Sequence, residues 1–401
     1  MLDRAGHPRG DSLPPSYTSR AQLPVQAHDT MLLLIPGPVT THPSVRAAAA
    51  LDYAPWDLEF RGLVARVMQR VLAIAGGRPG EHAALPLPGC GHFAMEAAVR
   101  TFVAPGGTIL VPLTGQYADR LVRLATEAGR RVVTLPVPPT ERADPAAVQA
   151  ALAADPAISH LAIVYSETAT GIVHDALSLA EAAGREGRRV LIDAVSAFGA
   201  MPLDIGRLPM VDSFSFTSNK CIEGLPGMSV TVARVDSLRA GAGRAASWSL
   251  DLADVHDNGE RWGLGTSRFT PAAQAVAAFA VALDRFDAEG GQPARLARYD
   301  ANMRVLYNGV LGLGLQPCLP PSVQGPVVVN VAAPADPAWS LQAFVDQLKG
   351  RGVLISNFYN TSAPSFRVGC IGAVTPDDMQ GAVRALGDAL AALGLRTRRA
   401  A

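Results

Sequence analysis

The residues with the clearest chemical potential in this chain are its lysines, because it has almost none. Lysine and arginine together number 35, and only Lys220 and Lys349 are lysines. Lys220 ends the strand-like run 214–220, immediately before a turn rich in glycine and proline. A guanidinium stays protonated, whereas a desolvated lysine amine can form a Schiff base with an aldehyde. Lys220 is therefore the first candidate for covalent chemistry; the alternative is a lysine kept by chance in an arginine-rich chain.

A carboxylate and a group of hydroxyls follow two other strand-like runs. Asp193 closes the run 189–193 and precedes small residues. A buried carboxylate requires a partner, although an aspartate at this position could also cap a helix. The segment Ser166–Gly171 follows a strand that ends at Tyr165, and its hydroxyls suit either a ligand or a turn. Both groups become candidates for one site if their strands end at the same edge of a sheet.

A glycine-rich turn, Gly89–His92, leads into a helix that we expect to begin near Phe93. The free N–H groups and the positive dipole end of a helix suit a phosphate group. The turn is not a P-loop, because no Gly-Lys-Ser/Thr follows, and it lacks the GxGxxG dinucleotide motif. A purely structural turn is the alternative interpretation.

Short apolar runs rich in branched residues indicate buried strands, and helical segments separate them. Asp144-Pro145 combines an N-cap with a proline at the first helical position, which predicts a helix through Leu152. This alternation predicts an α/β fold with a mainly parallel sheet covered by helices on both faces. Because the carboxyl ends of parallel strands meet at one edge, the polar groups above are expected to lie together. The predicted strands are 108–113, 131–135, 160–165, 189–193 and 229–233.

Three regions are expected along the chain. Residues 1–30 are rich in proline, serine, arginine and glycine and predict a mobile arm. Residues 31–289 would form the large sheet domain, and residues 290–401 a smaller α+β domain in which Asp336-Pro337 opens a helix. The last helix carries an apolar stripe that indicates core packing, made of Met379, Val383, Leu386, Leu390 and Leu393.

The composition argues against several classes of function. The formal net charge is zero, which disfavours nucleic acid and anionic membranes as partners. The longest apolar runs, such as 31–35, are too short to cross a bilayer. The four cysteines show no CxxC spacing, so neither a zinc site nor a disulfide framework is predicted. We therefore expect a reduced, cytoplasmic protein without a bound metal.

The candidate residues fit one cofactor, pyridoxal phosphate (PLP), when they are taken as a set. Lys220 would bind its aldehyde as a Schiff base, and Asp193 would keep its pyridine nitrogen protonated so that the ring acts as an electron sink. The helix that follows Gly89–His92 would receive the phosphate at its N-terminus. The sequence therefore predicts a PLP site at the carboxyl edge of the sheet.

The tract from Pro36 to Gly372 resembles the class-V group of the fold-type-I, PLP-dependent aminotransferases. The segment Asn219–Ile222, followed by Pro226-Gly227, is the most diagnostic part and resembles the branch that acts on aminophosphonates. The resemblance implies an α/β fold of type I, with a large, mainly parallel-sheet domain and a smaller α+β C-terminal domain. The other matching segments are 34–41, 56–57, 166–171, 193–199, 249–252, 268–270 and 366–372.

The resemblance also implies roles for individual residues. Lys220 would be the Schiff-base lysine and the base that moves the substrate proton, and Asp193 would pair with the pyridine nitrogen. Arg367 would bind the acid group of each substrate in turn, because a planar guanidinium can hold a carboxylate or a phosphonate. Thr270 would reach the phosphate from a neighbouring subunit, since this family builds its sites at a homodimer interface. The other implied contacts are Cys90, Gly91, His92 and Ser218 around the phosphate, Tyr117 stacked on the ring, Thr168 and Thr170 near the ring hydroxyl and substrate, and Trp56 at the substrate.

The implied activity transfers the amino group of 2-aminoethylphosphonate to pyruvate, giving phosphonoacetaldehyde and L-alanine in phosphonate catabolism. Three segments depart from the phosphonate branch, namely 89–93, 270–274 and 356–364. His92 resembles instead the branch in which alanine or serine is the donor and glyoxylate or pyruvate the acceptor. That reaction is the alternative activity.

Two further hypotheses belong to other classes. A PLP lyase of the cysteine desulfurase kind would need a mobile thiol, for which Cys318 in a proline-rich loop is the candidate. A regulator or scaffold that keeps the PLP fold without catalysis is the non-enzyme alternative. An amino donor and a 2-oxo acid are the partners expected of the leading hypothesis.

Overall fold

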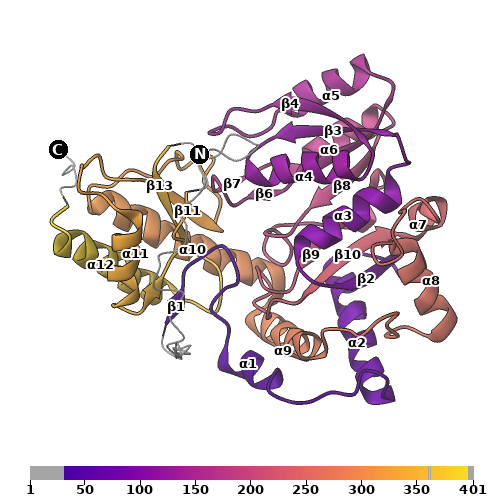
Figure 1. Ribbon diagram of the computed structural model, residues 1–401, viewed down its shortest axis with the longest axis horizontal. Helices are drawn as coiled ribbons and strands as arrows, with labels where there is room; N and C mark the ends of the chain where they lie inside the picture. The colour runs from indigo at the N-terminus through magenta and orange to yellow at the C-terminus, as the bar shows by residue number, and fades with distance from the viewer. Residues whose placement is uncertain (1–30, 360, 362, 396–401) are drawn as a thin grey trace, which may run out of the picture. The chain divides into compact units, whose positions relative to one another are not determined.

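A seven-stranded sheet forms the centre of the fold (Figure 1). The computed structural model describes residues 31–359, 361 and 363–395, so the arm predicted over 1–30 lies outside the described residues. Strand β10 runs antiparallel to both of its neighbours, and the other neighbouring pairs are parallel. The prediction of a mainly parallel sheet is therefore confirmed. In spatial order the strands are β2 (His82–Pro88), β10 (Met228–Arg234), β9 (Val211–Thr217), β8 (Arg189–Asp193), β5 (Ile158–Val164), β3 (Thr108–Leu113) and β4 (Arg131–Pro136).

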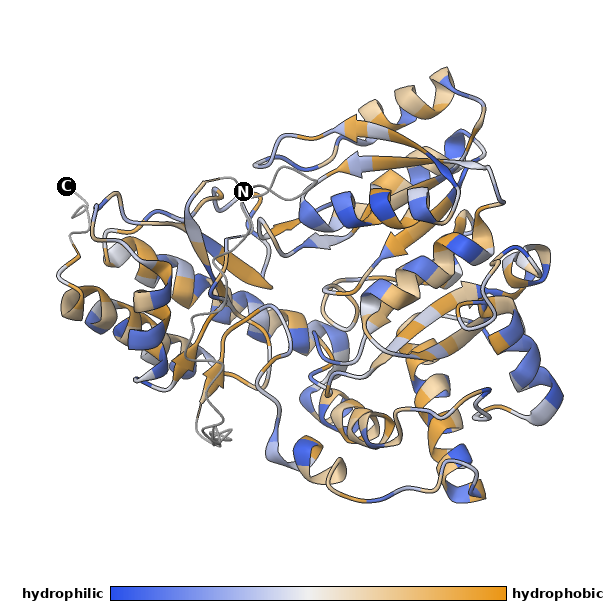
Figure 2. Cartoon of the chain, viewed as in Figure 1, coloured by the Kyte–Doolittle hydropathy of each residue, from blue (hydrophilic) through white to orange (hydrophobic). Residues whose placement is uncertain are grey.

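Helices cover both faces of this sheet. Successive strand residues point to opposite faces, and because both sets are apolar, both faces must be buried. In β8, Val190 and Ile192 belong to one hydrophobic core and Leu191 belongs to another. Figure 2 shows hydrophobic residues running along the central strands, as burial on both faces requires. The first core includes residues of α2 (Leu58–Ile74), α5 (Pro145–Ala154), α6 (Ala176–Arg185) and α9 (Ala273–Glu289), and the second includes residues of α3 (Gly91–Phe102), α4 (Gln116–Glu127), α7 (Val235–Gly241) and α8 (Leu252–Trp262).

Two predicted helix starts are found at or near their expected positions. Asp144 caps α5 by accepting a hydrogen bond from the Ala146 N–H at 2.9 Å, and Pro145 is the first helical residue. Helix α3 begins at Gly91 rather than near Phe93, with Cys90 as its N-cap. The unpaired N–H groups of its first turn therefore belong partly to the glycine-rich turn itself.

A further core lies in the C-terminal part of the chain. Strand β1 (Leu32–Leu33) pairs with β12 (Val353–Leu354), and β11 (Val328–Ala332) pairs with β13 (Ser365–Gly369). Helices α10 (Gly291–Gly312), α11 (Leu341–Lys349) and α12 (Pro376–Ala392) contribute residues to this core, as does Leu34. The stripe predicted on α12 packs here as expected, although Val383 and Leu393 are only partly buried. The domain boundary at residue 289 stays a prediction.

The prediction that a helix begins at Asp336-Pro337 is wrong. The Asp336 side chain accepts a hydrogen bond from the Ala338 N–H at 2.9 Å, which closes a turn. Helix α11 begins later, at Leu341, and Ser340 is its N-cap. Aspartate before proline favours turns as well as helix starts, so this dipeptide does not distinguish the two.

Helix α10 follows α9 directly and takes part in two cores. Gly290, with a left-handed φ of 109°, ends α9 and permits the change of direction. Along α10, Tyr299 packs into the first core of the sheet and Leu306 into the C-terminal core. This helix therefore joins the sheet to the strand that carries Arg367. The remaining elements are α1 (Pro43–Ala48), the hairpin of β6 (Ser166–Glu167) and β7 (Ile172–Val173), and a short 3₁₀ turn, Ile205–Arg207.

Within residues 31–359, 361 and 363–395, no helix combines the length and apolar character needed to cross a membrane. The same part of the chain contains no group of three or more His, Cys, Asp or Glu side chains placed to hold a metal ion.

Candidate active site

Lys220 lies in the turn that follows β9. This strand is buried along its whole length, with Phe214 and Phe216 in the core, so it carries the turn into the interior. The Lys220 Nζ donates a hydrogen bond to the Pro36 carbonyl at 2.8 Å. Burial lowers the pKa of this amine to about 8, and the charge of Arg367 acts in the same direction. More of the amine is therefore neutral at pH 7 than in an ordinary lysine, as a nucleophile or base requires.

Asp193 is the last residue of β8, the strand beside β9. Its Oδ1 accepts a hydrogen bond from the Val195 N–H at 2.9 Å. Burial raises the pKa of this carboxyl to about 6, while that hydrogen bond and the charge of Lys220 oppose the rise. A cation held against Asp193 would favour its ionised form, so the position suits a protonated ring nitrogen.

A cavity of about 330 Å³ joins these two residues to the ends of neighbouring elements. The start of α3, the first turns of α4 and the residues after β8 and β9 contribute to its walls. Its volume is within the range of small-molecule sites. Six of the predicted site residues line it: Cys90, Gly91, His92, Tyr117, Asp193 and Lys220.

The first turn of α3 lies directly against the turn after Asp193. A side chain on residue 91 would place its Cβ 2.3 Å from Cγ2 of Val195, so only glycine fits without a shift. Cys90, the N-cap, makes no side-chain capping hydrogen bond. The backbone N–H groups at this helix start therefore remain available to an anion in the cavity.

Arg367 approaches the site from β13. Its Nη1 donates to the Thr168 carbonyl at 2.8 Å and its Nη2 to the Ser356 hydroxyl at 3.2 Å. The Phe358 ring centroid lies 5.4 Å from the guanidinium carbon. The Thr168 hydroxyl is buried and makes no hydrogen bond to any described residue. Arg367 and Thr168 thus form a polar group, and the charge of Arg367 lowers the pKa of Lys220.

Six predicted residues lie outside the walls of the cavity, namely Arg367 and Thr168, described above, and four others. The Ser218 hydroxyl donates to the Leu225 carbonyl at 2.6 Å, and the Thr170 hydroxyl lies 3.4 Å from the Glu167 carbonyl. Both hydroxyls therefore stabilise local turns. Trp56 and Thr270 are exposed in this single chain. The roles predicted for these four residues stay predictions.

Sequence reasoning missed two residues of this region. Arg120 lines the cavity, and its guanidinium carbon lies 4.9 Å from the centroid of the Tyr117 ring. Glu167 is fully buried and accepts hydrogen bonds from the Tyr117 N–H at 3.1 Å and the Ala169 N–H at 3.0 Å. Burial raises the pKa of Glu167 to about 7, although those hydrogen bonds oppose the rise. For Glu167, the sequence signal was an acidic residue among hydroxyl-bearing residues, shortly after a buried strand.

The thiol proposed for lyase chemistry is held by local structure. The Cys318 N–H donates to the Asn330 carbonyl at 2.8 Å, and its neighbour Pro317 forms a β-bridge with Val331. Burial raises the pKa of the Cys318 thiol, which lowers the thiolate fraction. These contacts argue against a mobile nucleophile at this position.

The fold and the site together define a class of protein. The family model described as "Aminotransferase class-V" matches residues 85–312, and the chain belongs to this family. This family depends on pyridoxal phosphate and transfers amino groups from a donor to a keto acid. The predicted family and enzyme class are therefore confirmed.

Two relatives narrow the comparison. The 2-aminoethylphosphonate–pyruvate transaminase of Burkholderia ambifaria is 40% identical over 92% of this chain and 98% of its own. The 2-aminoethylphosphonate–pyruvate transaminase of Pseudomonas aeruginosa PAO1 is 40% identical over 90% of this chain and 96% of its own. Both alignments span nearly the whole described chain.

A solved structure shows the same fold. Pyridoxamine–pyruvate aminotransferase from Mesorhizobium loti superposes with a TM-score of 0.83, at 23% identity over 92% of this chain and 94% of its own. The likeness confirms the predicted fold of type I.

Proposed function

We propose that this chain is a PLP-dependent transaminase that moves the amino group of 2-aminoethylphosphonate to pyruvate. The observation that carries the proposal is the shared cavity of Lys220 and Asp193, at the ends of neighbouring strands. Relatives that are 40% identical over nearly the whole chain carry the name of this reaction. Phosphonoacetaldehyde and L-alanine are the products.

The donor set of the cavity fits PLP. Lys220 supplies a buried amine, and Asp193 supplies a buried carboxylate whose ionised form a nearby cation would stabilise. The Thr168 hydroxyl lies outside the residues that line the cavity, but it is buried without a partner among the described residues, and a substrate oxygen would satisfy it. The start of α3, with Cys90, Gly91 and His92, would hold the phosphate. When bound, PLP supplies an electron sink for the electron pair left on the substrate Cα.

Lys220 has two tasks in this proposal. Its neutral amine would hold the cofactor covalently, and the same Nζ, once free, would accept the proton from the substrate Cα. Asp193 would pair with the ring nitrogen and favour its protonated form. The lowered pKa of Lys220 favours both tasks because it increases the neutral amine at pH 7.

Arg367 would bind the acid group of each substrate in turn. Its guanidinium is buried, and the hydrogen bonds that it donates to the Thr168 carbonyl and the Ser356 hydroxyl orient it. The planar guanidinium of arginine can donate two hydrogen bonds both to the phosphonate of the donor and to the carboxylate of the acceptor. One residue can therefore serve both halves of the reaction.

Replacing Arg367 by lysine should raise the KM for both substrates while affecting kcat less. An ammonium keeps the charge but loses the two-pronged contact, which costs about 1.5–3 kcal/mol, or roughly 10–100-fold in KM. Steady-state kinetics with each substrate varied in turn measure this. An increase for pyruvate alone would contradict a shared acid-binding role.

A second copy of the chain would complete the site. Trp56 and Thr270 lie outside the cavity of one chain, and two exposed aromatic side chains, Trp248 and Phe269, contact each other with ring centroids 5.0 Å apart. Exposed apolar side chains that gather on a surface are typical of protein interfaces. In a homodimer, Thr270 of one copy would reach the phosphate bound by the other copy, and the exposed aromatic side chains would be buried at the interface. The exposed aromatic side chains of the described residues include Trp56, Trp248, Trp262 and Phe269.

A half-reaction experiment tests the donor. The enzyme loaded with PLP is mixed with one amine in the absence of a keto acid, and the cofactor absorbance is followed. We expect 2-aminoethylphosphonate to convert the cofactor fully to its amine form, and alanine to do so through the reverse reaction. If serine converts the cofactor faster than 2-aminoethylphosphonate does, with glyoxylate as the better acceptor, the alternative donor and acceptor pair replaces this proposal.

A further inference from the structure

The turn that carries Lys220 contains a strained residue. Glu223 has a φ of 62°, and among the described residues only Ala246 shares such a left-handed conformation without being glycine. The Glu223 N–H donates to the Lys220 carbonyl at 2.9 Å, so this conformation closes the turn. A non-glycine residue at positive φ costs on the order of 1 kcal/mol and persists where surrounding contacts hold it.

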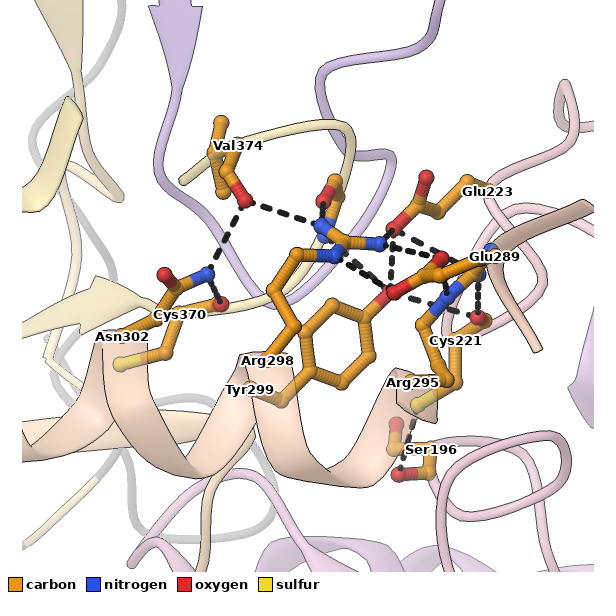
Figure 3. Close-up of polar contacts among 11 residues, drawn as sticks. Ser196, Cys221, Glu223, Glu289, Arg295, Arg298, Tyr299, Asn302, Cys370 and Val374 are labelled. Atoms are coloured by element: carbon orange, nitrogen blue, oxygen red, sulfur yellow. Dashed lines mark hydrogen bonds and ion pairs between the residues drawn. The ribbon is translucent and has the colours of Figure 1, made fainter. Parts of the chain in front are cut away.

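Helix α10 holds this turn from one side, as Figure 3 shows. The Glu223 Oε1 accepts hydrogen bonds from the Tyr299 hydroxyl at 2.6 Å and from Arg298 Nη2 at 2.7 Å. The carbonyl of Cys221, the residue after Lys220, accepts a hydrogen bond from Arg295 Nη1 at 2.5 Å. Both ends of the segment that follows the lysine are therefore fixed to α10.

Charge is balanced within this cluster. Glu289, at the end of α9, accepts hydrogen bonds from Arg295 Nε and Arg298 Nε, each at 2.7 Å. Two carboxylates thus face two guanidiniums in a largely buried setting. Burial, and then the charge of Glu223, raises the pKa of Tyr299 well above its ordinary value, so its hydroxyl stays protonated and donates. Removing one carboxylate would leave two guanidiniums facing one carboxylate, with one buried positive charge uncompensated.

The same face of α10 holds the segment that follows β13. Arg298 Nη1 donates to the carbonyls of Gly372 at 2.6 Å and Val374 at 2.9 Å. Asn302 Nδ2 donates to the carbonyls of Cys370 at 3.0 Å and Val374 at 3.1 Å. Strand β13 ends just before this segment and carries Arg367. Arg298 therefore contacts the turn of Lys220 and the segment beyond the Arg367 strand at once.

A weaker contact ties the turn to Asp193 as well. The Cys221 thiol donates to the Ser196 carbonyl at 3.4 Å, in the loop that follows Asp193. Burial raises the pKa of Cys221 to about 12, so the thiol stays protonated and can donate.

We infer that Glu223 is a positioning residue for Lys220, and that the Glu223–Arg298–Tyr299 cluster keeps the lysine turn and the Arg367 strand in one fixed relation. The inference rests on the proposed function, because it assumes that Lys220 binds the cofactor and Arg367 the substrate. Lys220 must reach the substrate Cα while Arg367 holds the acid group at the other end. A misplacement of about 1 Å between such groups can cost roughly 10²-fold in rate. The strain at Glu223 is retained because its side chain sets this placement.

Glu223→Gln in the full-length protein tests the inference. The amide keeps the size of the side chain and an acceptor for Tyr299, but it removes the charge that Arg298 faces. We expect the Kd for PLP, from fluorescence titration of the apoprotein, to rise about tenfold, and kcat to fall about 10–100-fold. Amide hydrogen exchange should accelerate in the 220–224 turn. Tyr299→Phe removes one hydroxyl without leaving a charge unpaired, should change the same quantities less, and serves if Glu223→Gln does not fold.

Asp212→Asn is the matched control. Asp212 is a buried carboxylate at the opposite end of β9, where its Oδ1 accepts a hydrogen bond from Arg189 Nε at 2.7 Å. This variant should lower the Tm through the same loss of buried charge pairing. It should leave PLP affinity, kcat and exchange at 220–224 within twofold of the wild type.

The outcomes separate the inference from the proposed function. If Glu223→Gln and Tyr299→Phe lower the Tm but behave like the control in PLP affinity, kcat and exchange, the cluster is structural only and the inference is wrong. PLP affinity and exchange need no amino donor. If the wild type rejects 2-aminoethylphosphonate while these two readouts change as expected, the donor assignment fails and the inference stands.

Discussion

Replacing Lys220 by arginine is expected to abolish transamination while leaving the protein folded. A guanidinium stays protonated at neutral pH, so it can neither add to the cofactor aldehyde nor accept a proton from the substrate Cα. A positioned general base alone contributes roughly 10²–10⁴-fold, so we expect kcat to fall by at least about 10³-fold. The positive charge is kept in a site where the lysine amine already donates to the Pro36 carbonyl. The Tm and the steady-state rate, measured together, check this result.

Lys349→Arg is the control for this variant, because it changes the other lysine. Lys349 is the last residue of α11 and should tolerate arginine with unchanged kinetics. A second test uses Lys220→Ala with a small primary amine added to the solution. The added amine should restore part of the rate in proportion to its neutral concentration, because it replaces the missing base. Appreciable activity in Lys220→Arg would overturn the assigned mechanism.

Much of the site was predictable because its residues follow strands that local sequence patterns reveal, and these strands end at the same edge of the sheet. Asp193 is the last residue of β8 and Lys220 lies in the turn after β9, and parallel strands bring such ends together. The turn at Gly89–His92 was recognisable from its glycines and the helix after it. These signals depend only on a few neighbouring residues, so the sequence carries them directly.

Other parts depend on contacts that local patterns do not encode. Arg120 faces the cavity because of how α4 is rotated on the sheet, which no short motif specifies. Glu223 is fixed by Arg298 and Tyr299, which lie about 75 residues away in sequence on a helix whose position follows from tertiary packing. Thr270 needs a second chain before its predicted role can be realised. The misplaced helix start at Asp336 arose because turns and helix caps share one local signal.

Asp193→Asn should separate activity from stability. An asparagine amide cannot hold a protonated ring nitrogen by charge, so the cofactor becomes a poorer electron sink. Loss of one such preorganised electrostatic contact costs about 10²–10³-fold in kcat. The Asp212→Asn variant, at the far end of the sheet, should keep its kcat. A kcat for Asp193→Asn within a few-fold of the wild type would contradict the role given to this carboxylate.

Although Asp193→Asn should lower kcat, it should raise the stability of the apoprotein at pH 7. Burial raises the pKa of Asp193 from 3.8 to about 6, so between these values the native state binds more protons than the unfolded chain. The free energy of unfolding therefore falls as the pH rises through this window, by about 3 kcal/mol for a shift of this size. Asparagine does not ionise, so the Asp193→Asn apoprotein should lack this fall and unfold at a higher denaturant concentration than the wild type at pH 7.

The pKa of Asp212, a buried carboxyl in the same sheet, is shifted in the opposite direction to that of Asp193. Burial would raise its pKa, but hydrogen bonds from His160 and Arg189 hold the pKa of Asp212 below its ordinary value. Asp212 therefore contributes stability that is lost as the pH falls, and Asp212→Asn should destabilise the apoprotein at pH 7. Denaturant unfolding of the wild-type, Asp193→Asn and Asp212→Asn apoproteins, from pH 7 to below pH 4, measures the contrast, because the Asp193 effect changes within pH 4–7 and the Asp212 contribution is lost only below the ordinary pKa of 3.8. A carboxylate that destabilises the apoprotein, yet is required for turnover, is what a site built to receive a cationic ring would contain.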